Sequence, residues 1–204
     1  MQKLKTRKLN RLKNYYYSTN GYYFITICSK NRKIIFGEYI EYPVGTALAA
    51  VRNNIPDNVQ QKNIIKLSGL GNIIKKQWIN IPNQYNNVEL DQFMIMPTHI
   101  HGIIIINKRT GASPVPTISN IIGSFKSKTS VEYLRYINDE KLNVPGQIWQ
   151  RSFYDHVIRN DKSLREIREY IKNNPCNWVN DKENANNQNN KKHKPEVLQC
   201  QLQY

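Results

Sequence analysis

The sequence has few cysteines, few acidic residues and no long apolar run. Its three cysteines, Cys28, Cys176 and Cys200, are odd in number and widely separated, which argues against a disulfide framework and against a zinc site built from cysteine. No segment reaches the roughly 18 consecutive apolar residues that a membrane-spanning helix needs. No apolar stretch of a secretory signal follows the basic N-terminus, so we expect a cytoplasmic protein.

Acidic residues are missing from two zones of the chain. There are 30 Lys and Arg against 15 Asp and Glu, a formal net charge of +15. No acid precedes Glu38, and none lies between Asp91 and Glu132. Each basic run alone is compatible with an ordinary solvated surface, but two acid-free zones favour a surface that follows phosphates. The charge therefore points to a polyanion, with nucleic acid ahead of an anionic membrane.

Hydrophobic residues make up 39% of the 204 residues, which is enough for one modest core. Residues 1–20 resemble a basic arm, 43–66 an insertion with weak periodicity, and 181–204 a polar tail that we expect to be disordered. Apolar periodicity predicts strands at 22–29, 88–96 and 100–107, a further strand within 34–42, an extended segment at 147–158, and helices at 70–81, 119–136 and about 161–173. This order predicts an α+β fold with one antiparallel sheet and helices packed on one face.

The stretch MIMPTHIHGIIIIN carries the most informative pair of residues. His99 and His101 lie two apart at the start of an apolar strand, so both imidazoles project from one face, about 6–7 Å apart at the backbone. Ile100 between them points into the core. A lone histidine in a strand is usually structural, but this pair can converge on one divalent ion. Such a site would need a further oxygen ligand.

The last predicted helix offers Tyr170 and Asn174, four residues apart on one face. The Tyr170 hydroxyl would be a competent nucleophile toward a metal-bound phosphate, and the Asn174 amide oxygen can complete the metal site. Spacing alone favours a structural role, in which Tyr170 packs beside Ile167 and Ile171 and Asn174 ends the helix before Pro175.

The segment FYDHVIRN contains a rival nucleophile and a third histidine. Tyr154 lies in an extended region, where packing in the core or at a sheet edge is the simpler role. His156 is either a structural hydrogen-bonding residue or an auxiliary group near the metal or DNA. Arg151 and Arg159 flank this segment and are candidates for contacts with phosphate.

MPTHIHGIIII resembles the histidine–hydrophobe–histidine (HUH) motif of the IS200-like, single-tyrosine transposases. The stretch IWQRSFYDHVIRNDKSLREIREYIKNNPCNW looks like the corresponding region of the REP-associated branch of that family. The resemblance covers about residues 20–180 and departs at Thr98, where the family usually has Asn or another polar residue. It implies a ferredoxin-like HUH nuclease fold.

By this resemblance, His99, His101 and Asn174 would hold Mg²⁺ or Mn²⁺, and Tyr170 would attack a scissile phosphate of single-stranded DNA. The products would be a covalent 5′-phosphotyrosine and a free 3′-hydroxyl that can later rejoin the strand. The expected partner is single-stranded DNA with a hairpin or palindromic element at the nucleoid, bound by a monomer or homodimer. Candidate DNA contacts are Lys8, Arg11 and Lys13 in the arm, Lys126 and Lys128 in helix 119–136, and Arg151 and Arg159.

Two alternatives use the same features. A domesticated protein would bind DNA hairpins through the basic surface without cleaving them. A replication initiator or relaxase would share the chemistry, but such proteins often place two tyrosines on one helix, and only Tyr170 occurs in helix 161–173.

Overall fold

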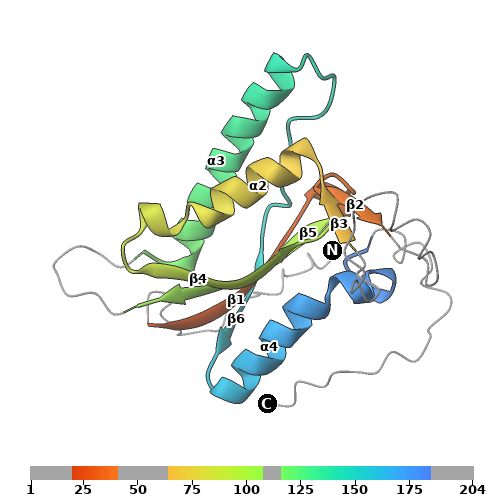
Figure 1. Cartoon of the computed structure of the whole chain (residues 1–204). Helices are drawn as coiled ribbons and strands as arrows, with labels where there is room; N and C mark the ends of the chain where they lie inside the picture. Colours follow the sequence, from red (N-terminus) through yellow and green to blue (C-terminus); the bar gives the residue numbers. More distant parts are fainter. Residues whose placement is uncertain (1–19, 41–63, 108–115, 185–204) are drawn as a thin grey trace, which may run out of the picture.

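The computed structural model describes residues 20–40, 64–107 and 116–184 (Figure 1). Its main sheet has the strand order β4-β5-β1-β6, and each neighbouring pair is antiparallel. These strands are β1 (Gly21–Cys28), β4 (Val88–Ile95), β5 (His99–Ile106) and β6 (Tyr154–Ile158). The predicted α+β fold with an antiparallel sheet is confirmed.

One face of the main sheet packs against two helices, α2 (Gly69–Ile79) and α3 (Ile118–Asp139). Strand alternation sends Ile100 and Ile104 of β5 to this face, where they join Trp78 of α2 and Phe125 of α3 in the larger core. Trp78 and Phe125 meet edge to face, with ring centroids 5.3 Å apart. None of the helices in the described ranges has the length and apolarity that a bilayer crossing requires.

The opposite face is covered by α4 (Asp161–Asn173), which lies below the sheet in Figure 1 while α2 and α3 lie above it. Leu164, Ile167 and Ile171 of α4 bury their side chains against Ile103 of β5 and Ile158 of β6. The expectation of helices on one face therefore holds for α2 and α3, whereas α4 covers the other face. The physical reason is that β5 is apolar on both faces, so each face needs a cover.

Shorter elements complete the described fold. A second sheet pairs β2 (Gly37–Ile40) with β3 (Ile64–Leu67). The end of the predicted insertion 43–66 thus belongs to a strand, while 41–63 lie outside the described residues, as do 1–19 of the arm. Three 3-10 turns follow strands or helices: η1 (Lys30–Arg32), η2 (Pro82–Gln84) and η3 (Pro175–Asn180).

Side-chain caps set where the helices begin. Asn160, rather than Ser163, is the N-cap of α4, and its side chain accepts a hydrogen bond from the Ser163 backbone N–H at 2.8 Å. Ser68 and Thr117 cap α2 and α3 in the same way. The cap at Asn160 fixes the start of α4 and therefore the position of Tyr170, which lies ten residues further along the chain.

Candidate active site

His99 and His101 project from the face of β5 that α4 covers. In the register with β1, His99 lies opposite Cys28 and His101 lies opposite Thr26. The ring centroids are 4.4 Å apart, and the two side chains are 0% and 1% exposed. Ile100 between them packs into the core on the other face. The alternation of the strand thus brings both imidazoles together, as the spacing predicted.

Thr98 sets the tautomer of His99. The Thr98 hydroxyl donates its single proton to the Glu183 carbonyl oxygen at 2.8 Å. Its 3.2 Å contact with His99 Nδ1 therefore requires that Nδ1–H donates to Thr98 Oγ1. The lone pair of the neutral ring then lies on Nε2, which is the form that binds a metal. Thr98, the position at which the chain departs from the family pattern, therefore orients the imidazole of His99.

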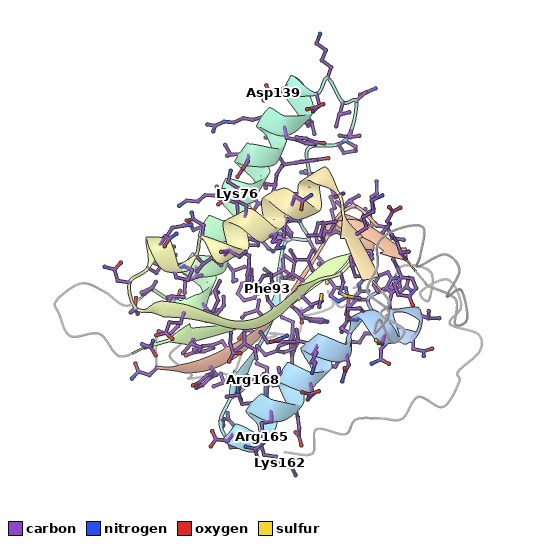
Figure 2. All side chains as sticks on the ribbon, in the orientation of Figure 1. Lys76, Phe93, Asp139, Lys162, Arg165 and Arg168 are labelled. Atoms are coloured by element: carbon purple, nitrogen blue, oxygen red, sulfur yellow. The ribbon has the colours of Figure 1, made fainter. Side chains whose placement is uncertain are left out.

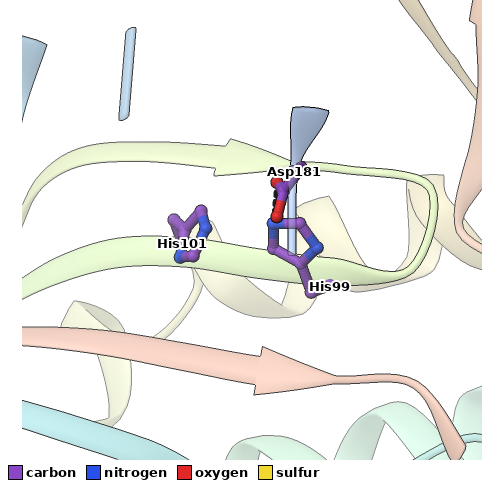
Figure 3. Close-up of side chains that lie close together, drawn as sticks. All are labelled: His99, His101 and Asp181. Atoms are coloured by element: carbon purple, nitrogen blue, oxygen red, sulfur yellow. Dashed lines mark ion pairs between the residues drawn. The ribbon is translucent and has the colours of Figure 1, made fainter. Parts of the chain in front are cut away.

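Asp181 joins the site although no sequence pattern indicated it. One ligand atom from each of His99, His101 and Asp181 lies within 4.8 Å of the others. Figure 3 shows the three side chains. Asp181 Oδ2 is 3.5 Å from His99 Nε2, and Asp181 Oδ1 accepts a hydrogen bond from the Glu183 backbone N–H at 2.7 Å. The predicted tail therefore begins too early, because Asp181, Glu183 and Asn184 are buried.

One signal could have identified this segment. Trp178 is buried, and its ring centroid is 6.1 Å from that of His99. An apolar aromatic three residues before Asp181 anchors η3 against the site, and the chain then turns back over β5. The polar composition after Trp178 concealed this packing in the sequence.

Tyr170 is the tyrosine that meets the histidine pair. Its hydroxyl is 3.2 Å from His101 Nε2, and the neighbouring side chain of Asn174 partly offsets the rise that burial causes in its pKa. Tyr170 remains 43% exposed, whereas Asn174 is 2% exposed. Tyr154, the rival candidate, lies in the edge strand β6 opposite Thr26. The geometry therefore brings together Tyr170, Asn174 and both histidines; their roles stay predictions.

Burial dominates the electrostatics of this cluster. Desolvation, aided by Arg32 and Lys182, lowers the pKa of His99 to about 3, and burial also lowers the pKa of His101 well below its usual value. Both rings are therefore neutral at pH 7. Burial and the nearby Asp181 raise the pKa of Tyr170 to about 12, so its phenol is protonated. Burial also raises the pKa of the Asp181 carboxyl.

The donor set fits a divalent cation. Among the described residues, His99 Nε2 and Asn174 Oδ1 are buried and have no hydrogen-bond partner. Leaving such atoms unsatisfied is costly, and a cation bound there would satisfy both. Two neutral imidazoles with carboxylate and amide oxygens form the mixed N/O environment that divalent transition ions accept.

The other predicted residues that the structure describes lie on α3 and in or beside β6. His156 lies in β6 opposite Phe24, and its pKa is lowered by burial and by Arg159. The Lys126 ammonium donates to the backbone oxygens of Gln150 and Ser152, at 2.9 and 3.0 Å. Lys128 donates to Gln84, and Arg151 and Arg159 are exposed. Lys8, Arg11 and Lys13 lie outside the described residues.

Comparison with known proteins identifies the family. Residues 60–174 match the family described as "Transposase IS200 like". An uncharacterized protein of Haemophilus influenzae is 37% identical over 191 residues, which cover 86% of this chain and 91% of that relative.

Two solved structures share a weaker likeness. A REP-associated tyrosine transposase bound to a REP hairpin is 17% identical, with a TM-score of 0.46 over 82% of this chain and 74% of its own. A transposase-like protein of Deinococcus radiodurans is 18% identical, with a TM-score of 0.40 over 80% of this chain and 95% of its own. On the family match, which covers more than half of its residues, the chain belongs to the IS200-like transposases.

Proposed function

We propose that this transposase is a metal-dependent endonuclease and strand transferase for single-stranded DNA that carries a hairpin, with Tyr170 as its nucleophile. The observation that carries the proposal is the 3.2 Å contact between the Tyr170 hydroxyl and His101 Nε2, within the cluster that also holds His99 and Asp181. A nucleophile, neutral imidazoles and a carboxylate in one place match the needs of phosphodiester cleavage.

His99, His101, Asp181 and Asn174 would hold Mg²⁺ or Mn²⁺. When bound, the ion would neutralise charge on the scissile phosphate and make the phenol more acidic. The Tyr170 oxygen attacks phosphorus, its proton leaves, and the bond from phosphorus to the 3′ oxygen breaks. That oxygen takes up a proton and becomes a free 3′-hydroxyl, while the 5′ phosphate stays on Tyr170. Because the bond energy is conserved, attack by the 3′-hydroxyl on phosphotyrosine rejoins DNA without an external energy source.

The conformation of α4 supports this role for Tyr170. Leu164, Ile167 and Ile171 bury one face of the helix, and this packing turns Tyr170 toward His101. Partial exposure leaves the Tyr170 hydroxyl reachable by a DNA strand. The hairpin preference follows the motif resemblance, and the excess positive charge supports a nucleic-acid partner.

The test is covalent trapping on a labelled, hairpin-bearing single strand with Mn²⁺. We expect wild type and Tyr154→Phe to form an adduct that survives denaturing gel electrophoresis, and Tyr170→Phe to form none. An adduct with Tyr170→Phe would show that the nucleophile is another residue. Hairpin binding by wild type without an adduct in any divalent metal would instead support the catalytically idle binding protein.

A further inference from the structure

A basic groove of about 890 Å³ lies at the end of β1, between η1 and the segment 146–151 that precedes β6. Lys30, Arg32 and Arg151 contribute to its lining, and none of the residues that line it is acidic. We propose that this groove binds the phosphodiester backbone of the single DNA strand next to the scissile phosphate. The inference rests on the function proposed above and assigns a path to the strand.

Backbone hydrogen bonds fix the groove beside the active site. The Lys30 N–H donates to the Ile148 oxygen at 2.8 Å, and the Gln150 N–H donates to the Cys28 oxygen at 3.0 Å, so the two walls are joined. Cys28 lies opposite His99 in the pairing of β1 with β5. Both walls of the groove are therefore held beside Cys28, which is the neighbour of His99 in the sheet. A DNA strand that lies in the groove would pass next to the active site.

Arg32 lies where the groove meets the cluster. Its Nε pairs with Glu183 Oε2 at 2.5 Å, and Glu183 is hydrogen-bonded through its backbone to Asp181. Asn31 and Arg32 have φ values of 55° and 52°, a left-handed conformation that residues with a β-carbon rarely adopt. This unusual turn therefore lies between the groove and the active site.

The lining suits a phosphate backbone better than a protein segment. Lys30 and Arg151 line the groove with no acid among the lining residues, while Arg32 is paired with Glu183 at its inner end. Gln147 and Ser130 add neutral hydrogen-bonding groups. Lys30 already donates to Gln147, which holds its ammonium at the wall, and Arg151 is exposed. Contacts of this kind neutralise phosphates without reading bases, so the groove would accept strands of many sequences.

The experiment measures how binding of labelled oligo(dT) of 20 nucleotides to the full chain depends on salt. Each phosphate neutralised on a single strand contributes about 0.7 to the slope of log affinity against log salt. We expect Lys30→Ala/Arg151→Ala to reduce the steepness of that slope by about 1.4, and Arg151→Lys to keep the wild-type value. Arg151→Ala alone, at an exposed position that should tolerate it, should reduce the steepness by about 0.7.

The matched control is Lys75→Ala/Arg165→Ala, which removes the same charges from exposed positions on α2 and α4. Slopes for the groove variants equal to those of this control would overturn the proposal. Adduct formation by wild type is assayed separately on the hairpin substrate. A wild type that forms no adduct would refute the nuclease, whereas the slopes decide the groove.

Discussion

The guanidinium of Arg168 on α4 donates hydrogen bonds to both carboxylate oxygens of Asp91 on β4. Arg168 Nε lies 3.1 Å from both carboxylate oxygens, and Nη2 lies 2.5 Å from Oδ2. Asp91 lies where the register of β4 shifts between Leu90 and Phe93, an irregularity that re-aims its side chain. Figure 2 labels Arg168 and Phe93 on these two elements. This ion pair between Arg168 and Asp91 holds α4 in one rotation about its axis, and Arg168 lies two residues before Tyr170.

We predict that Arg168→Ala slows adduct formation about tenfold while changing DNA affinity less than twofold, because small displacements of a nucleophile are costly. The loss in free energy of unfolding should stay below about 1 kcal/mol, since the pair is partly exposed. Single-turnover adduct assays and chemical denaturation measure the two effects.

The control for this prediction is Arg165→Ala, an exposed position on the same helix. The exchanged pair Arg168→Asp/Asp91→Arg should recover part of the rate. An Arg168→Ala protein with the wild-type adduct rate would show that the ion pair does not position Tyr170.

Loss of the Asp181 charge should weaken metal binding. A ligand that binds only the folded protein at 100 times its dissociation constant adds about 2.7 kcal/mol to the free energy of unfolding. We expect Mn²⁺ to raise the melting temperature of wild type, to have little effect on His99→Ala, and to require at least about tenfold higher concentration for Asp181→Asn. Asp139→Asn, at the exposed end of α3, is the control. A wild-type response in Asp181→Asn would remove Asp181 from the ligand set.

Local patterns predicted most of the fold and indicated His99, His101 and Asn174 of the candidate metal site, but not Asp181. The spacing of His99 and His101 was sufficient to predict that their side chains lie together, because side chains alternate between the two faces of any strand. In β5, Ile100 packs into the core on one face and the two histidines meet on the other. Asp181 could not be found this way, since its approach to His99 depends on η3 turning back over the sheet. That turn is a tertiary effect of burying Trp178.

Lys126 stays a predicted DNA contact, and the structure adds contacts within the protein that the sequence did not indicate. An acid-free zone indicated a DNA contact, but the side chain reaches across to the backbone oxygens of Gln150 and Ser152. Its ammonium also lies 6.0 Å from the Trp149 ring. Composition records charge but not the direction in which a long side chain folds.

Lys126→Met should therefore reduce the free energy of unfolding by more than it reduces the free energy of DNA binding. Two hydrogen bonds from a charged donor, to the backbone oxygens of Gln150 and Ser152, lead us to expect a loss of about 1–3 kcal/mol in free energy of unfolding. Lys128→Met, which removes one exposed contact with Gln84, should change it by less than about 0.5 kcal/mol. Urea denaturation measures both variants, and equal effects would contradict the structural role of Lys126.

His156 should contribute to acid sensitivity. Burial and Arg159 lower its pKa in the folded state below the ordinary value of 6.5. As the pH falls through 6.5, the unfolded chain therefore binds the proton more readily, and stability is lost. We expect the free energy of unfolding of wild type, relative to His156→Gln, to fall between pH 7.5 and 5.5. A difference that stays constant across this window would show that His156 does not titrate differently on folding.

Two glycines offer a matched test of the core beneath the histidines. A β-carbon at Gly102 would lie 2.4 Å from Cζ2 of Trp78, so β5 needs glycine there for α2 to pack closely. Gly102→Ala should cost about 1–3 kcal/mol of stability, because the buried indole must shift. At Gly123, exposed on α3, nothing lies within 4 Å of an added β-carbon, and Gly123→Ala should stabilise by about 0.5–1 kcal/mol.

Thermal or urea unfolding of the two glycine variants separates the steric effect from the entropic one. Because Gly102 follows His101 directly, a shift of β5 should also reduce adduct formation in Gly102→Ala, whereas Gly123→Ala should retain the wild-type rate. A Gly102→Ala protein as stable as wild type would mean that Trp78 does not pack against this strand as closely as 2.4 Å implies.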